Sequence, residues 1–325
     1  MVPAEAVERF RRDLETLTEG PPDKIGVAVS GGPDSLALLL LAAAAYPGRV
    51  EAATVDHHLR PEGAAEAAHV AAICDHLGIP HATLSLEWPD PRGNNIQARA
   101  REGRYLELLG WALDKSLPYV ATAHHVNDQA ETVLMRLARG SGVSGLAGTR
   151  PRKLLGGHAD TGASVELVRP LLGWRREELA GIVTGAALTA VDDPSNSDHR
   201  YDRVRVRAFL SGNDWLDPQR LAESASHLFD AEEALAWWLN QVFADRHTHH
   251  EDGSVTLDPS DLPRELQRRL LLQGLSFFAG CTDLPGPKVA RLLDELRAGR
   301  SSMIGDIKVT AGRTWHLDWA PPRRS

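Results

Sequence analysis

Cysteine is scarce in this sequence, which has only Cys74 and Cys281 among 325 residues. Two cysteines so far apart build neither a disulfide framework nor a four-cysteine metal site. Each lies in an apolar stretch with helical spacing. We therefore expect both to be core thiols.

Long apolar runs are also absent, and the longest candidate, Leu36–Ala45, falls short of the about 20 residues that a membrane span needs. Residues 1–20 are charged and amphipathic rather than leader-like. We expect a cytoplasmic protein without a membrane partner. The net charge of -8 argues against a generally cationic surface that binds any nucleic acid, although arginines cluster locally.

Short apolar segments alternate with helical patterns through the first half of the chain. The expected strands are 25–29, 52–55, 81–86 and 119–123, and the expected helices between and after them are 33–45, 62–77, 95–115 and 128–139. This alternation predicts an α/β fold with right-handed crossovers and a parallel, Rossmann-like sheet that carries helices on both faces.

The pattern changes in the last third of the chain. From Pro218 onward it is mostly helical, over 221–243, 263–278 and 285–296, and a hairpin is expected within 306–319. We place a boundary near Gly212-Asn213. The prediction is a catalytic domain over 1–212 and a mostly helical domain over 213–325.

The segment AVSGGPDS, residues 28–35, joins the first expected strand to a helix. Its two glycines let the backbone approach a ligand, and the unpaired N–H groups of the first helical turn favour an anion. It has neither the Gly-Lys-Ser/Thr ending of the common mononucleotide loop nor three spaced glycines. It resembles the PP-loop, SGGxDS, of ATP pyrophosphatases, which cleave ATP between the α and β phosphates. The alternative is a plain Gly-Gly turn in the core.

Polar residues follow two other expected strands, as Asp56-His57-His58 and as His124-His125. Ligands of parallel sheets gather beyond the carboxyl ends of the strands, so these clusters and the loop at 30–35 are predicted to share one crevice. ATP carries Mg²⁺, which carboxylates and phosphate oxygens bind, and Asp34 and Asp128 suit it. Alternatively, Asp128 is a helix N-cap with Glu131, one turn later, as its capping-box partner.

Six motifs occur in a fixed order, namely SGGPDS, VDHHLR, NIQARAREGRY, AHHVNDQAETVLMRLARGSGVSGLAG, RPLL and DPSNSDHRYDRVRVR. Together they resemble the tRNA(Ile)-lysidine synthetase family over roughly residues 24–210. The resemblance implies a ligase that uses ATP to adenylate the wobble cytidine of the CAU anticodon of tRNA(Ile). Free L-lysine then displaces AMP to give lysidine, after pyrophosphate has left.

The resemblance also implies roles for the matching residues. Those implied for ATP are Ser30, Gly31, Gly32, Pro33, Asp34, Ser35, Asp56 and His57. The implied catalytic residues are Asp34, His124, Asp128 and Glu131, of which Asp34 and Asp128 hold Mg²⁺. Lysine is expected at Glu131 and Arg203, and phosphate or RNA at Arg99, Arg104 and Arg205. Val204 departs from the family, which often has Arg-Asn-Arg where this chain has Arg-Val-Arg.

Other functions stay open. Thiolation of a tRNA cytidine needs an iron–sulfur cluster held by cysteine pairs, which two isolated cysteines do not provide. Ligases such as GMP and NAD synthetases adenylate a small molecule instead, and an ATP-binding, RNA-binding module without catalysis is a third alternative. If the family resemblance holds, we expect the C-terminal domain to contact the tRNA, and we allow for a homodimer.

Overall fold

The computed structural model describes residues 2–58, 62–86, 96–158, 162–191, 202–278, 284 and 286–320. Its packing divides the chain into two compact units, Met1–Phe229 and Asp230–Ser325. This division falls inside helix α9 (Pro218–Arg246), which is later in the chain than the Gly212-Asn213 boundary expected from the sequence.

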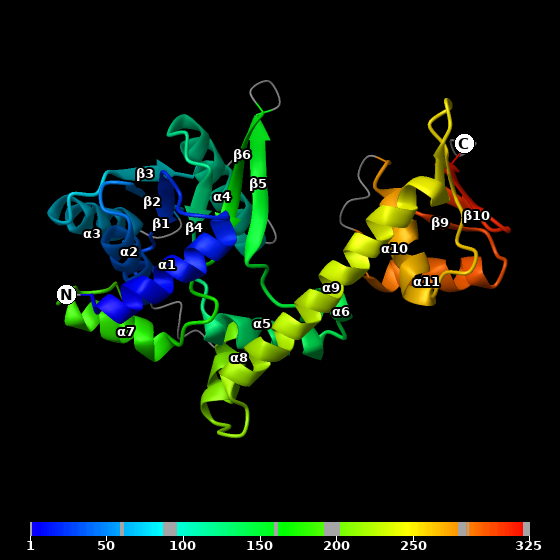
Figure 1. The fold of residues 1–325 in the computed structure, drawn as a ribbon. Coiled ribbons are helices and arrows are strands. Elements are labelled where there is room, and N and C mark those ends of the chain that lie inside the picture. Colours follow the sequence, from blue (N-terminus) through cyan, green and yellow to red (C-terminus); the bar gives the residue numbers. More distant parts are fainter. Residues whose placement is uncertain are drawn as a thin grey trace. The chain divides into compact units, whose positions relative to one another are not determined.

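The first unit is built on a six-stranded sheet with the order β3-β2-β1-β4-β6-β5 (Figure 1). The parallel strands are β1 (Ile25–Ala28), β2 (Val50–Asp56), β3 (His81–Ser85), β4 (Tyr119–Ala121) and β6 (Ala163–Val168). The prediction of a parallel sheet is confirmed. One edge strand, β5 (Arg152–His158), pairs antiparallel with β6 and is not among the strands expected from the sequence.

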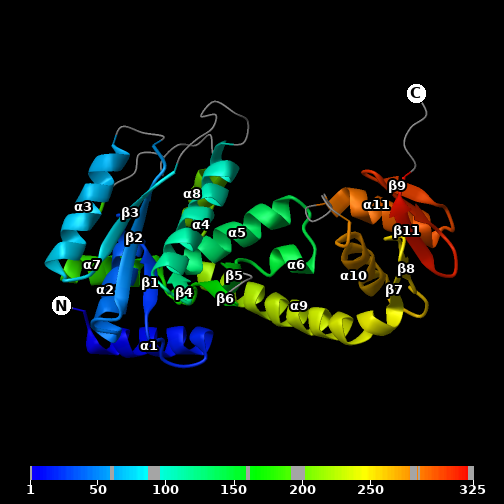
Figure 2. The same ribbon diagram turned by 90° about the horizontal axis from the view of Figure 1, so that it is seen from above.

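Helices cover both faces of this sheet (Figures 1 and 2). One face carries α1 (Ala4–Thr18), α2 (Pro33–Ala45), α3 (Gly63–His76) and α7 (Arg176–Gly185), and the other carries α4 (Ile96–Asp114). Helix α2 is apolar all round because the sheet lies on one side of it and α1 and α7 on the other. On the opposite face Trp111 lies against β1 at Gly26, where a Cβ would come within 2.8 Å of the indole ring.

The strand order reverses between β1 and β4, because β2 and β3 lie on one side of β1 and β4 lies on the other. In open α/β sheets, such a reversal opens a crevice at the carboxyl ends of the strands. The loop at 30–35 leaves β1 there, and the His124-His125 pair leaves β4. Helix α5 (Val126–Ala138) follows this pair and packs against α8 (Asp202–Ser211), a helix that the sequence pattern did not indicate.

The second unit combines helices with a five-stranded antiparallel sheet, β7-β8-β11-β10-β9. The strands are β7 (His247–His249), β8 (Val255–Leu257), β9 (Ser302–Ile304), β10 (Ile307–Thr310) and β11 (Trp315–Trp319). Helices α10 (Arg264–Leu275) and α11 (Gly286–Arg297) pack on them with the end of α9. The predicted hairpin is the pair β10–β11. The rest of the sheet was not predicted, because its strands are only three residues long.

Cys74 is fully buried in α3, as expected of a core thiol, and burial raises its pKa to about 11. Cys281 lies outside the described residues. Within the described ranges, no helix combines the length and the apolar character that a membrane crossing requires.

Candidate active site

A cavity of about 670 Å³ lies at the carboxyl ends of β1, β2 and β4. Its polar lining consists of Ser30, Asp34, Ser35, Thr54, Asp56, His57, His58, Glu66, Arg101, Arg104, Thr122, His124, Asp128 and Arg203, with the backbone of Gly32. The prediction that the three polar clusters share one crevice is therefore confirmed. The volume is in the range of sites for small molecules and cofactors.

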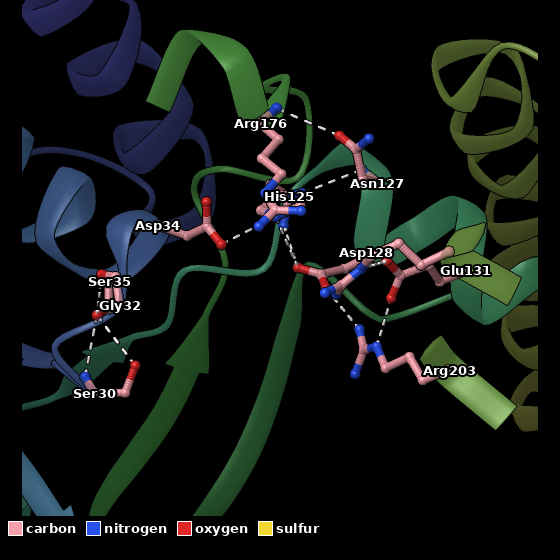
Figure 3. Close-up of polar contacts among 11 residues, drawn as sticks. Ser30, Gly32, Asp34, Ser35, His125, Asn127, Asp128, Glu131, Arg176 and Arg203 are labelled. Carbon is pink, nitrogen blue, oxygen red and sulfur yellow. Dashed lines mark hydrogen bonds and ion pairs between the residues drawn. The ribbon is translucent and has the colours of Figure 1, made fainter. Parts of the chain in front are cut away.

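The loop after β1 is tied together by its two serines (Figure 3). The Ser35 hydroxyl donates to the Gly32 carbonyl over 2.9 Å and accepts the Ser30 N–H over 3.1 Å. Gly31 has a φ of +84°, a left-handed conformation that favours glycine. Helix α2 begins directly afterwards at Pro33 without a side-chain cap, so its first-turn N–H groups are available to an anion.

Asp34 and Asp128 meet at the ring of His125 (Figure 3). The Nε2 atom of His125 lies 3.3 Å from Oδ2 of Asp34 and 3.6 Å from Oδ2 of Asp128. The N–H of Asn127 donates to Nδ1 of the same ring over 3.2 Å. Burial lowers the pKa of His125, but the hydrogen bond with Asp34 and the charges of the nearby carboxylates outweigh it and raise the pKa.

The expectation that Asp128 opens helix α5 is wrong, because α5 begins at Val126 and His125 is its N-cap. Asp128 stands at the third helical position, where its carboxylate accepts the His125 N–H over 3.1 Å. The capping box is real, but its members are His125 and Asp128 rather than Asp128 and Glu131. A histidine cap was hard to foresee, since Ser, Thr, Asp and Asn are the usual cap residues.

The carboxylate pair suits a hard cation that phosphate also binds. Oδ1 of Asp34 is buried and has no hydrogen-bond partner among the described residues, so one carboxylate oxygen is left for a ligand. The described residues contain no cluster of three or more His, Cys, Asp or Glu side chains arranged to hold a metal. Mg²⁺ commonly takes one or two carboxylates and completes its shell with water and phosphate oxygens.

Glu131 lies behind the cavity wall rather than on it. The residue is 1% exposed, and its two carboxylate oxygens accept from Arg203 Nε over 2.6 Å and from Arg207 Nε over 2.8 Å. Arg203 also donates to Asp128 Oδ1 over 2.6 Å and does line the cavity. The two arginines of α8 thus bind the acidic face of α5, as Figure 3 shows for Arg203.

His124 is surrounded by cations. Burial, followed by the charges of Arg169, Arg104, Arg203 and Arg101, keeps its pKa well below the ordinary 6.5. The imidazole is therefore neutral at physiological pH. Its Nδ1 lies 3.1 Å from the Thr122 hydroxyl, so Nε2 is the nitrogen left for a ligand.

The loop after β2 closes on itself around Asp56. The buried Asp56 carboxylate accepts the His58 N–H over 2.9 Å and lies 3.3 Å from His58 Nδ1. These contacts hold His58 at a φ of +49°, which is uncommon for a residue other than glycine. Asp56 and His57 both line the cavity, as the sequence indicated.

The remaining predicted arginines divide between the cavity and the surface. Arg104 lines the cavity, whereas Arg99 and Arg205 do not, and Arg205 is exposed on α8, 3.7 Å from Asp202. Arg101 lines the cavity and was not chosen from the sequence. Helical spacing could have identified Arg101. Arg101 and Arg104 are three residues apart and share a helix face, whereas Arg99 and Arg104 are five residues apart and do not.

Comparisons with known proteins place the sequence in a family. Residues 6–213 match the PP-loop domain family ATP_bind_3. The chain is 44% identical over 318 residues to the tRNA(Ile)-lysidine synthase of Zymomonas mobilis subsp. mobilis, covering 97% of this chain and 94% of that protein. It is 45% identical over 321 residues to the tRNA(Ile)-lysidine synthase of Novosphingobium aromaticivorans, covering 98% and 95%.

Among solved structures, the fold is similar to that of the U34-tRNA thiolase NcsA from Methanococcus maripaludis with its 4Fe-4S cluster. The TM-score is 0.54 at 18% identity, and the match covers 71% of this chain and 78% of the thiolase. At this identity the likeness concerns the fold alone.

Proposed function

Because the chain belongs to the tRNA(Ile)-lysidine synthase family, we propose that it joins free L-lysine to the wobble cytidine of tRNA(Ile) with a CAU anticodon. In the first step, cytidine O2 attacks the α-phosphorus of ATP and pyrophosphate leaves. In the second, the lysine ε-amine attacks C2, and the C2–O bond to AMP breaks. The observation that carries the proposal is one cavity lined by the 30–35 loop, Asp34, Asp128 and the neutral His124.

ATP would be held where β1 passes into α2. Ser30, Gly31, Gly32, Pro33 and Ser35 form this loop, and the uncapped α2 N-terminus directs N–H groups at the phosphates. Asp56 and His57 would contact the nucleoside from the end of β2. The Asp56 contacts to His58 support a role in fixing the shape of that loop.

Asp34 and Asp128 would hold Mg²⁺, which when bound neutralises the charge that builds on pyrophosphate. The buried, partnerless Oδ1 of Asp34 supports this assignment. His125 lies between the two carboxylates and keeps them on the cavity side of α2 and α5.

His124 is proposed as a hydrogen-bond donor to the reacting phosphate. A general base for a lysine ammonium needs a pKa near the working pH, and the low pKa of His124 makes it a poor acceptor. A neutral imidazole whose Nε2 is left for a ligand suits a phosphate oxygen better. This favours the contact role over proton transfer.

The contacts support different roles for Arg203 and Glu131 in binding lysine. Arg203 lines the cavity and would receive the lysine carboxylate. Glu131 is buried, does not line the cavity and already accepts from Arg203 and Arg207, so the contacts do not favour it as the site of the ε-ammonium. We assign Glu131 the role of holding Arg203 in place.

The proposed reaction places the protein in the cytoplasm with its tRNA. We also propose that the second unit, residues 230–325, contacts the body of that tRNA. Hydrogen exchange on the full chain tests this, because bound tRNA should slow exchange of amides in that unit. If amide exchange throughout residues 230–325 is the same with and without tRNA, the proposed tRNA contact of this unit is wrong.

The test of the function is incorporation of labelled lysine into tRNA(Ile) transcripts with and without the CAU anticodon. We expect incorporation only with CAU, with one AMP formed for each lysine attached. AMP formation without any tRNA would indicate a ligase for a small molecule. ATP binding without turnover would indicate a binding module.

A further inference from the structure

Cations gather around one aromatic ring at the α4 side of the cavity. The guanidinium carbons of Arg104 and Arg101 lie 5.4 and 5.6 Å from the centroid of the Tyr105 ring, and Lys153 Nζ of β5 lies 5.6 Å from it. These are cation–π distances. The Tyr105 hydroxyl is buried next to Arg169, whose charge and side-chain hydrogen bond both lower the pKa of the phenol.

Arg169 supports this cluster from the buried side. Only 4% of the residue is exposed, and Nη1 donates to the Arg150 carbonyl over 2.5 Å. Its Nε has no partner within the described part of the chain. Burial raises the pKa of the Tyr105 phenol, but the charges of Arg101, Arg104 and Arg169 outweigh burial and lower it.

Within the described part of the chain, no carboxylate is in salt-bridge contact with this group, and Glu66 is the carboxylate that lines the cavity with Arg101 and Arg104 beside Asp34, Asp56 and Asp128. In the described ranges, none of Arg101, Arg104 and Arg169 forms a salt bridge, whereas Arg203 and Arg207 both do. Uncompensated cations in a partly enclosed cavity repel one another and lose hydration, and a bound anion relieves both effects.

We propose that Arg101, Arg104 and Lys153, gathered around Tyr105, form an anion site that takes a backbone phosphodiester of the RNA strand entering the cavity. This rests on the proposed function. The phosphates of ATP already have the uncapped α2 N-terminus. Arg104 lines the cavity, Arg101 lines it and is also exposed, and Lys153 is exposed, so the positive charge continues from the cavity wall to the surface. A strand that extends beyond the cavity fits this row better than a nucleotide does.

Tyr105 and Arg169 act as positioning residues in this site. The Tyr105 ring restrains three long, flexible cationic side chains. Arg169 adds charge from the buried side without itself reaching the cavity wall.

The experiment compares Lys153→Gln and Arg101→Gln with the wild-type protein. Affinity for tRNA(Ile) is measured without ATP over a range of salt concentrations, and affinity for a non-hydrolysable ATP analogue is measured without tRNA. Each variant should weaken tRNA binding several-fold and reduce the slope of log K against log salt by about 0.7–0.9 for each phosphate that the variant no longer neutralises. Affinity for the analogue should not change in Lys153→Gln, because Lys153 does not line the cavity.

Lys115→Gln is the matched control, because Lys115 is an exposed lysine beyond the end of α4 that faces Asp114 at 3.5 Å. It should leave the salt slope as in the wild type. Tyr105→Leu, which removes the ring, should weaken tRNA binding more than Tyr105→Phe, which keeps it.

Two results overturn the site. The first is an unchanged tRNA affinity and an unchanged slope of log K against log salt in both Lys153→Gln and Arg101→Gln. The second is a loss of affinity for the ATP analogue alone, which would assign the cations to the nucleotide. Failure of the wild-type protein to incorporate lysine would instead overturn the proposed function. The two failures are distinct, because RNA affinity is measured without the reaction.

Discussion

Oδ2 of Asp34, at the start of α2, lies 3.3 Å from Nε2 of His125, the N-cap of α5. The contact joins two helix N-termini that follow the adjacent strands β1 and β4. It therefore spans the point where the strand order reverses. The carboxylate of Asp34 and the capping box of α5 share one ring, so a change in one alters the other.

Asp34→Asn and Asp128→Asn should each reduce pyrophosphate release in the presence of tRNA, on the order of 100-fold or more. Each change removes a negative charge proposed to bind the cation that stabilises the leaving group. In a titration with Mg²⁺, each variant should reach half of its maximal rate only at a higher Mg²⁺ concentration than the wild type. Asp75→Asn, at an exposed position on α3, is the control, and near-normal release by both site variants would exclude them as metal ligands.

The pH profile should show no loss of activity from His124 as pH falls through 6.5. Because the pKa of His124 is lowered, its ring stays neutral until the pH is well below 6.5. His124→Gln, which retains a hydrogen-bond donor, should keep more activity than His124→Ala at every pH. A rate that rises with acidification through 6.5 in the wild type but not in His124→Gln would show that the protonated His124 ring is the active form.

Arg203→Gln and Arg207→Gln should behave differently, although both arginines bind Glu131. Each should destabilise the fold by about 1–3 kcal/mol, because a buried carboxylate loses a charged partner while the other arginine remains. Only Arg203→Gln should also raise the KM for lysine, since Arg203 lines the cavity and Arg207 does not. Equal KM values for the two variants would remove Arg203 as the carboxylate contact.

Gly26→Ala should destabilise the first unit by about 1–3 kcal/mol, measured by the denaturant midpoint of the full chain. The new Cβ would meet two carbons of the Trp111 ring at 2.8 Å, and both the strand and the helix behind that ring are packed. Gly110→Ala is the matched control on α4, because nothing lies within 4 Å of its Cβ position. Alanine there should be neutral or stabilising by up to about 1 kcal/mol.

The sequence was sufficient for the parallel sheet and the position of the cavity, because both depend on strong local signals. Buried strands such as β1 and β4 are continuous apolar runs, and the side chains that follow them must meet at one edge of the sheet. Asp34, Asp56, His124 and Asp128 were found for this reason.

What the sequence did not indicate depends on contacts between distant segments. Arg203 is indicated by its motif, but the helix α8 that carries it and Arg207 is not, because α8 has no buried residue and therefore no apolar stripe. Because that helix was not predicted, the hydrogen bonds from both arginines to Glu131 could not be predicted either. The three-residue strands of the second unit likewise carry too little pattern to be recognised, and they become strands only by pairing.

Helix α2 has a consequence for how the site works. Leu36, Leu38, Leu39 and Leu41 are all fully buried, so this helix cannot fray or open without disrupting the core on every side. Its amide protons should be among the slowest in the protein to exchange. The loop at 30–35 is therefore attached to a rigid, fully packed helix. Its backbone N–H groups are held in position before a ligand binds.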